Sequence, residues 1–373
     1  AESPREVLRR VFGHEDFRHQ QEWAINRVLE GKSSLCVMAT GSGKTLCYQL
    51  PALLLGGVTV VVSPLLALMA DQLARLPPQL PGACLSGQVR AREAARVLKD
   101  LRAGRLRVLF LSPERLASPA FQRLLDAGAL PAVSLLCVDE AHCISQWSHN
   151  FRPAFLALGR AVARLRPRAV LGLTATATPR VARDVCRALG VPLGPAGGLR
   201  LGCWRRPGLR LTALRVAGGE PDKQDALVHL LQREPYASGS AIVYVGRRHT
   251  AEALADLLRS RGHTAVAYHG GMDAGARRDA QRRFLSGRAR VAVATVAFGL
   301  GIDKPDIRSV VHFHAPPSLE AYVQETGRAG RDGRGAAAAA LLQRRDFHAQ
   351  HGLAHADGVE LVQLQELVLV DLL

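Results

Sequence analysis

Residues 135–147 read Leu-Leu-Cys-Val-Asp-Glu-Ala-His-Cys-Ile-Ser-Gln-Trp, an apolar run that ends in two adjacent carboxylates. The run has the length and composition of a strand that is covered on both faces. Asp139 and Glu140 follow at its end, where such a pair can hold Mg²⁺ and orient a water molecule. Taken alone, the stretch fits an ordinary core strand and surface loop equally well, so the rest of the chain decides its meaning.

The loop after these carboxylates has side chains that suit a nucleic-acid strand. Between residues 146 and 153 it contains aromatic rings, an arginine and amide donors, which can stack on bases and bind phosphates. We predict that this loop couples phosphate chemistry to a polymer-binding surface. The residues expected to do so are His142, Gln146, Trp147, Phe151 and Arg152.

A glycine-rich loop predicts a phosphate-binding site. An apolar strand pattern at 34–38 leads into Ala-Thr-Gly-Ser-Gly-Lys-Thr at 39–45, and a helical pattern follows. Such loops surround phosphates with backbone N–H groups, and the N-terminus of the next helix faces the anion. The strict pattern has glycine where this chain has Met38, but strand, loop and helix stand in the right order. The expected phosphate contacts are Thr40, Gly41, Ser42, Gly43, Lys44 and Thr45, with Lys44 on the β- and γ-phosphates and Thr45 on Mg²⁺.

Strands and helices alternate along the chain. Strand patterns at 34–38, 58–62, 107–111, 135–139 and 169–173 are separated by helical patterns. This alternation predicts an α/β fold with a parallel sheet covered by helices on both faces. The strands that carry motifs end in polar residues, and ligands bind at the carboxyl ends of strands in such sheets.

A second strand series follows a loop rich in glycine and proline at 191–198. Its strands are expected near 209–215, 240–245, 264–269, 290–295 and 308–313, and a run of alanine and leucine follows at 336–342. We therefore predict two domains, 1–197 and 198–345, and a helical extension at 346–373. The chain starts with Ala1, and we expect it to be a fragment of a longer protein.

The second series has no phosphate loop of its own but carries a pair of arginines. Residues 324–333 read Gln-Glu-Thr-Gly-Arg-Ala-Gly-Arg-Asp-Gly, so Arg328 and Arg331 are three positions apart. On a helix these positions share a face, which would direct both guanidinium groups to one anion. Arginines that a second domain offers to a nucleotide stabilise the phosphoryl group during its transfer.

The composition favours a polyanion partner. The chain of 373 residues has 49 Lys and Arg against 32 Asp and Glu, a formal charge of +17, which favours nucleic acid through counterion release. Its seven cysteines are scattered without the paired spacing of a zinc site, so we expect reduced thiols and no zinc. No apolar run approaches the length of a membrane span, and the amino terminus is too charged for a signal peptide. An intracellular protein is expected.

Together these segments resemble superfamily 2 helicases, and specifically the RecQ family of DNA helicases. The similar segments are 17–21 (adenine reading), 38–51 (phosphate loop), 63–72, 139–142, 143–153 (the aromatic-rich loop peculiar to RecQ), 174–176, 294–305 and 324–331. The resemblance implies two tandem RecA-like domains with ATP and Mg²⁺ in the cleft between them. It also implies 3′→5′ movement on single-stranded DNA and unwinding of forked or tailed duplexes.

The resemblance also implies roles for single residues around the nucleotide. Gln21 would read the adenine with help from Arg18, and Asp303 would contact the ribose. Thr45 and Asp139 would hold Mg²⁺, Asp139 mainly through metal-bound water.

Other residues would carry out the hydrolysis. Glu140 would orient and deprotonate the attacking water. Arg331 would act as an arginine finger, and Arg328 and Gln324 would support the γ-phosphate and the closed state.

Some features depart from the usual RecQ pattern. Leu300 replaces a methionine, a change that conserves volume, and Arg247 stands where a small polar residue is usual. The zinc-binding cysteine cluster and the winged-helix domain are absent, so strong duplex separation does not follow from the resemblance. The loop variant at 148–150 and the segment 355–359 are similar to the Rothmund–Thomson-type branch.

Alternative functions remain open on this sequence. One is an RNA-stimulated helicase on the same core, and another is a DNA-binding or annealing scaffold with weak ATPase activity. We expect a monomer that acts in DNA repair, recombination or replication. It would lie in the nucleus of a eukaryote or in the cytoplasm of a bacterium.

Overall fold

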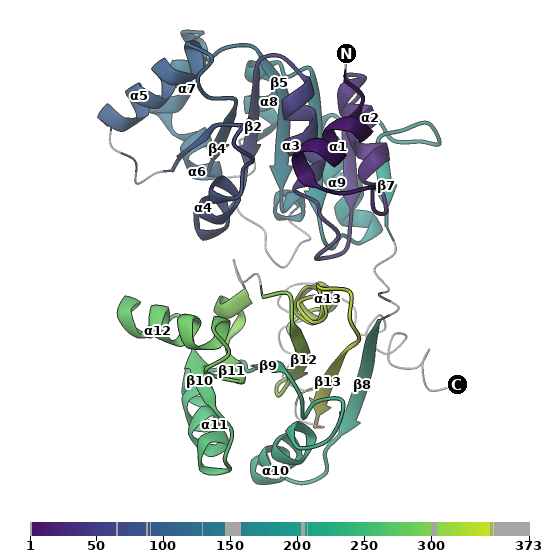
Figure 1. Cartoon of the computed structure of the whole chain (residues 1–373), viewed down its shortest axis with the longest axis vertical. Helices are drawn as coiled ribbons and strands as arrows, with labels where there is room; N and C mark the ends of the chain where they lie inside the picture. The colour runs from purple at the N-terminus through teal and green to yellow at the C-terminus, as the bar shows by residue number, and fades with distance from the viewer. Residues whose placement is uncertain are drawn as a thin grey trace. The chain divides into compact units, whose positions relative to one another are not determined.

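The structure, a computed structural model, divides the chain into two compact units, Ala1–Trp204 and Arg205–Leu373 (Figure 1). It describes residues 2–343 and 346 except 65, 87, 88, 90, 129, 146–157, 203–205, 207 and 300–303. The division lies beyond the boundary predicted after residue 197, because strand β7 (Leu199–Leu201) pairs with the first sheet. Of the predicted extension 346–373, all but Asp346 lies outside the described residues.

The first unit is built on a seven-stranded parallel sheet. Its strands, in spatial order, are β3 (Gly82–Leu85), β4 (Val108–Leu111), β2 (Val58–Val62), β5 (Val133–Asp139), β6 (Ala169–Thr174), β1 (Ser34–Val37) and β7. Its helices are α1 (Pro4–Phe12), α2 (Gln21–Leu29), α3 (Leu46–Leu54), α4 (Leu66–Ala74), α5 (Ala91–Arg102), α6 (Pro113–Ala117), α7 (Pro119–Asp126), α8 (Leu158–Leu165) and α9 (Pro179–Leu189).

Both faces of this sheet are buried under helices. Along β5, Leu136 and Val138 pack in a cluster with residues of α5 to α9, whereas Leu135 and Cys137 pack with residues of α2, α3 and α4. Successive side chains of a strand point to opposite faces, so a strand buried on both sides needs a continuous apolar run. The α/β sandwich predicted from residues 135–139 is therefore confirmed.

The second unit repeats this architecture with six parallel strands. Their order is β10 (Ala265–Tyr268), β11 (Val291–Ala294), β9 (Ser240–Tyr244), β12 (Ile307–His312), β13 (Ala336–Leu342) and β8 (Leu209–Arg215). Its helices are α10 (Glu220–Leu231), α11 (Arg248–Ser260), α12 (Ala274–Leu285) and α13 (Leu319–Thr326). Residues of α10 and α11 cover one face, and residues of α12 and of the turn after α13 cover the other.

Two properties of the described residues complete the fold. None of their helices is both long and apolar enough to cross a membrane. No three His, Cys, Asp or Glu side chains among them lie together as a metal site, and their cysteines are free thiols.

A buried ion pair connects α10 to the residues after β13 in the second unit. Lys223 in α10 has no solvent exposure, and its Nζ donates to Oδ2 of Asp346 at 2.7 Å. The same carboxylate oxygen accepts from the backbone N–H of Gln343 at 2.8 Å, and Gln343 Nε2 donates to the Gly219 carbonyl at 2.7 Å. These bonds join the residues after β13 to the start of α10.

Replacing Lys223 by methionine should destabilise the protein strongly, because the Asp346 carboxylate stays buried and loses its ammonium partner. We expect a loss of about 3–5 kcal/mol in the free energy of unfolding, measured by urea denaturation followed by circular dichroism. Arg282→Ala is the control, since it breaks an exposed pair with Asp279 (2.6 Å) and should change stability little. Equal effects of the two substitutions would contradict the prediction.

Candidate active site

The phosphate loop joins β1 to α3 at the carboxyl edge of the first sheet. Gly41 and Gly43 have φ of 81° and 77°, the left-handed region that glycine adopts without steric cost. Met38 is 2% exposed and its side chain packs in the core, so the fold accommodates a methionine where the phosphate-loop pattern has glycine. Lys44 Nζ donates to the carbonyls of Met38 at 3.2 Å and Ala39 at 3.4 Å, which holds its ammonium group over the loop.

Gln21, predicted to read the adenine, is hydrogen-bonded to the phosphate loop. Its Nε2 donates to the Ser42 and Gly43 carbonyls, both at 3.0 Å, and its Oε1 accepts from the Arg18 backbone N–H at 2.8 Å. A Cβ at position 43 would lie 2.5 Å from Gln21 Nε2, so the close approach requires glycine. Gln21 thus connects the segment before α2 to the loop, and its contact with a base stays a prediction.

A cavity of about 180 Å³ lies beside this junction. Phe12 and Leu46 contribute apolar surface, while Arg18, Gln21 and Gln49 contribute polar groups. The remaining lining residues are His14, Asp16, Gly41 and Gly43. The cavity has the mixed lining that suits a planar heterocycle with polar edges.

Asp139 ends β5 as a buried carboxylate, 5% exposed. Its Oδ2 accepts from Gln72 Nε2 at 3.0 Å and its Oδ1 accepts from the Glu140 backbone N–H at 3.0 Å. Burial and the charge of Glu140 raise the pKa of Asp139 to about 6, although Gln72 and the charge of Lys44 act to lower it. The carboxylate, the lysine and the phosphate loop therefore share one electrostatic environment.

Glu140 has the left-handed backbone conformation, with φ of 51° and ψ of 46°. This conformation is uncommon outside glycine and concentrates at functional sites. Among the described residues, no hydrogen-bond donor reaches its buried Oε2, and His142 Nδ1 lies 3.4 Å from that atom. Since a carboxylate oxygen is a strong acceptor, this one is suited to take a hydrogen bond from water.

His142 connects this carboxylate to the next strand. It is 2% exposed in the 3₁₀ turn Ala141–Ile144, and its Nδ1 lies 2.8 Å from Oγ1 of Thr174. Thr174 ends β6, and its hydroxyl donates to the carbonyl of Thr176 at 2.9 Å. A shift at the end of β6 would therefore reach the ring beside Glu140.

Gln72 and Thr174 lay in segments predicted as motifs but had no predicted role. A signal for them exists in the sequence, because Gln72 is in the helix after β2 and Thr174 ends β6. These two strands flank β5 in the sheet. Polar residues after strands that neighbour the carboxylate strand are the expected supporters of its charge.

The two arginines of the second unit lie beyond the end of their helix. Helix α13 ends at Thr326, and Arg328 and Arg331 lie in the following turns, so the predicted shared helix face was wrong. We call residues 327–332 the arginine turn. The two side chains still act on a common group, because burial raises the pKa of Tyr244 to about 12 while the charges of Arg328 and Arg331 lower it.

Buried polar contacts anchor α13 to the sheet. His312 Nε2 lies 2.7 Å from Oε2 of Glu325, and both residues are buried. The His312 ring stacks on Tyr244 with centroids 5.5 Å apart and an interplanar angle of 22°. Gln324, predicted to support the γ-phosphate, is half-buried on this helix.

Several predicted contacts cannot be placed. Gln146, Trp147, Phe151, Arg152 and Asp303 lie outside the described residues. Their predicted contacts with DNA and with the ribose stay predictions.

Comparisons with known proteins identify the family. The DEAD/DEAH box helicase model matches residues 18–185, and the helicase conserved C-terminal domain model matches residues 222–333. ATP-dependent DNA helicase RecQ of Pasteurella multocida is 39% identical over 343 residues, 92% of this chain and 52% of that protein. Probable ATP-dependent DNA helicase RecS of Bacillus subtilis is 37% identical over 370 residues, 98% of this chain and 72% of that protein. The chain belongs to the RecQ family of DNA helicases.

Other relatives set the extent of the similarity. ATP-dependent DNA helicase Q4 of Homo sapiens is 42% identical over 393 residues, which cover 99% of this RecQ chain and 32% of the human protein. The chain thus spans about a third to a half of several curated relatives. The helicase Lhr of Mycobacterium smegmatis, solved with ssDNA and AMP-PNP, has a TM-score of 0.65 at 25% identity, over 93% of this chain and 49% of that one. A DEAD box protein from Methanococcus jannaschii has a TM-score of 0.59 at 22% identity, over 96% of each chain.

The Asp139→Asn variant should be more stable than the wild type at pH 8. The Asp139 carboxyl has a pKa of about 6 in the folded protein against an ordinary 3.8, so its ionisation opposes folding. This cost is absent below pH 4, grows between pH 4 and 6 and is complete above pH 6. We expect a gain of about 2 kcal/mol at pH 8 that disappears near pH 4, measured by urea denaturation without nucleotide or Mg²⁺. A difference that does not change with pH would contradict this assignment.

Proposed function

We propose that this RecQ chain is the motor core of an ATP-dependent DNA helicase that moves 3′→5′ along single-stranded DNA and unwinds duplexes. One observation carries the proposal: the buried Asp139, its neighbour Glu140 and the phosphate loop with Lys44 share one sheet edge and one electrostatic environment. The names of the relatives, all ATP-dependent DNA helicases, support DNA as the polymer.

ATP would bind along the carboxyl edge of the first sheet. The phosphates would lie on the backbone of residues 40–45, with Lys44 on the β- and γ-phosphates. The cavity lined by Arg18 and Gln21 would receive the adenine, and Asp303 would contact the ribose. Gln21 is well placed for a sensor role, because its hydrogen bonds to the loop carbonyls link base binding to phosphate binding.

The donor set of this edge fits Mg²⁺. The ion prefers oxygen ligands, and the Thr45 hydroxyl and the Asp139 carboxylate provide them. Asp139 is a buried carboxylate whose raised pKa reflects insufficient compensation of its charge, which a divalent cation would supply. When bound, Mg²⁺ would neutralise charge on the phosphate oxygens.

Hydrolysis would use Glu140 as the base. Its Oε2 would accept a hydrogen bond from the attacking water and take the proton as the water oxygen bonds to the γ-phosphorus. The bond from that phosphorus to the β,γ-bridging oxygen would break, and ADP would leave with the electron pair on that oxygen. The His142 ring, with Nδ1 at 3.4 Å from Oε2, would lie beside the carboxylate. Arg331 would stabilise the negative charge on the transferring group, and Arg328 and Gln324 would support it.

DNA binding to the loop after β5 would change the orientation of the Glu140 side chain. Trp147 and Phe151 would stack on bases, and Gln146 and Arg152 would bind the backbone. His142 is at the start of this segment and is bonded to Thr174 at the end of β6. A strand held by the loop would thereby bias the side chain that orients the water.

Lys44→Ala should abolish ATP turnover, because the phosphates lose the charge that neutralises them in the transition state. We expect a fall of about 100-fold or more in DNA-stimulated turnover. The control is Lys32→Ala, since Lys32 is an exposed lysine of the same unit paired with Glu30 at 2.8 Å. The assay compares single-stranded DNA, single-stranded RNA and forked duplex DNA as stimulants. Stronger stimulation by RNA, or turnover that survives in Lys44→Ala, would contradict the proposed function.

Trp147→Ala should separate DNA stimulation from nucleotide binding. Loss of one stacking ring removes about 1–3 kcal/mol of strand binding and leaves the phosphate loop intact. We expect DNA-stimulated turnover to fall while the dissociation constant of a fluorescent ADP stays within twofold. Unchanged stimulation by DNA would rule out the coupling role of the loop.

A further inference from the structure

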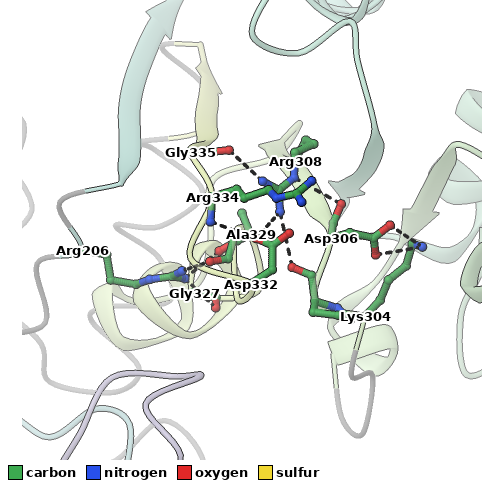
Figure 2. A network of polar contacts seen from close by, with 11 residues as sticks. Arg206, Lys304, Asp306, Arg308, Gly327, Ala329, Asp332, Arg334 and Gly335 are labelled. Carbon is green, nitrogen blue, oxygen red and sulfur yellow. Dashed lines mark hydrogen bonds and ion pairs between the residues drawn. The ribbon is translucent and has the colours of Figure 1, made fainter. Parts of the chain in front are cut away.

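Arg206 reaches from the start of the second unit to the arginine turn (Figure 2). Its Nη1 donates to the carbonyls of Gly327 at 3.1 Å and Ala329 at 2.6 Å, and its Nη2 donates to the carbonyl of Gly330 at 2.5 Å. The three carbonyls belong to the residues that surround Arg328 and precede Arg331. One guanidinium group thus sets the path of the backbone on which both arginines stand.

The chemistry of this contact favours arginine over any other residue. Carbonyls at the end of a helix lack intrahelical partners and carry the negative end of the helix dipole, so a cation there is stabilising. Bonds to an ionised donor are about twice as strong as neutral ones. Burial lowers the pKa of Arg206, whereas Asp332 raises it, and a guanidinium stays charged at physiological pH.

The far end of the same turn is fixed by a second arginine. Nη2 of Arg308 donates to Oδ1 of Asp332 at 2.6 Å, and its Nη1 donates to the Gly335 carbonyl at 3.0 Å. Between the two anchors Gly330 has φ of 61°, and its N–H donates to the Ile307 carbonyl at 2.8 Å. Figure 2 shows Arg206 and Arg308 reaching the turn from opposite sides. The backbone of the arginine turn is therefore held at both ends and in the middle.

We propose that Arg206 is a positioning residue for ATP hydrolysis: it holds the backbone of the arginine turn so that Arg328 and Arg331 are aimed at the γ-phosphate. The inference rests on the proposed function, since it presumes that the arginine turn serves ATP. It adds that the turn is controlled by the second residue of the second unit, directly after the segment that joins the two units.

Arg206→Ala and Arg206→Lys test this role against a matched control. Arg290 uses the same chemistry elsewhere: it donates to the carbonyls of Leu231, Tyr236 and Ala237 at 2.9, 3.0 and 2.6 Å, and burial likewise lowers its pKa. Leu231 and Tyr236 belong to the core cluster on the opposite face of the sheet from Ala329. Arg290→Ala therefore removes a comparable arginine cap without touching the arginine turn.

The readouts are the kcat and KM of DNA-stimulated ATP turnover and the melting temperature of each variant. We expect Arg206→Ala to lower kcat about 10-fold or more, because small misplacements of catalytic groups have large effects on rate. The KM for ATP should change less than kcat, since Arg331 is proposed to act on the transferring group and the proposed contacts of the phosphate loop and of Gln21 with ATP are in the first unit. Arg206→Lys should restore little, because an ammonium group cannot serve three carbonyls with the geometry of a fork. Arg290→Ala should lower the melting temperature while kcat stays within twofold.

The inference is overturned if kcat of Arg206→Lys stays within twofold of wild type, or if Arg290→Ala lowers kcat as much as Arg206→Ala does. The lysine variant decides the question if the alanine variant fails to fold. Arg331→Ala separates this inference from the proposed function. If Arg331→Ala leaves turnover intact, the role of the turn in hydrolysis fails and the inference fails with it. If Arg331→Ala removes turnover and the Arg206 variants do not lower it, the positioning role alone fails.

Discussion

A negative charge buried at the end of β5 is the constraint on which the first unit depends. Asp139 is removed from water by a sheet covered on both faces, and its charge opposes folding when it ionises. The compensation comes from three other places in the chain: Gln72 after β2, the N–H of Glu140 and the ammonium of Lys44 after β1. Only a parallel sheet with neighbouring strands in register brings these groups to one edge. The fold is thus the condition for keeping the Asp139 carboxylate out of water.

The second unit has the same architecture, but the charged groups of interest in it are positive, whereas the buried carboxylate of the first unit is negative. The charges proposed to act in this unit, those of Arg328 and Arg331, lie in a turn between a helix and a strand. Ala329 of this turn packs in the core, and hydrogen bonds to the backbone fix the path of the residues around it. Arg206 and Arg308 supply these bonds. The buried Lys223–Asp346 pair connects the residues after β13 to α10. Arginine suits this role because its fork reaches several carbonyls while its charge persists.

The parts of the fold that carry long apolar runs are predictable from sequence. The predicted strands at 58–62 and 135–139 are present, because β-branched or continuously apolar runs suit strands buried on both faces. Strands β3 and β7 were not predicted, since each is short, partly exposed and poor in β-branched residues. The arginine turn was misassigned to a helix, because the end of α13 is set by tertiary contacts of residues 327–330 that the local pattern does not contain. Asp139, Glu140 and Lys44 stand out in the sequence as candidate site residues, whereas connecting Gln72 and Thr174 to Asp139 also requires the strand order.

A buried histidine joins the site segment to a neighbouring strand in each unit. His142 lies between Glu140 and Thr174 of β6, and His312 lies between Glu325 of α13 and the ring of Tyr244 on β9. Apolar packing alone tolerates small slides, because dispersion contacts have no preferred direction. A hydrogen bond to a rigid ring fixes both distance and angle, so a shift of one element changes the orientation of the other. The 3₁₀ turn after Glu140 and helix α13 are therefore each coupled to the sheet by a directional contact, through His142 with Thr174 and through His312 with Glu325.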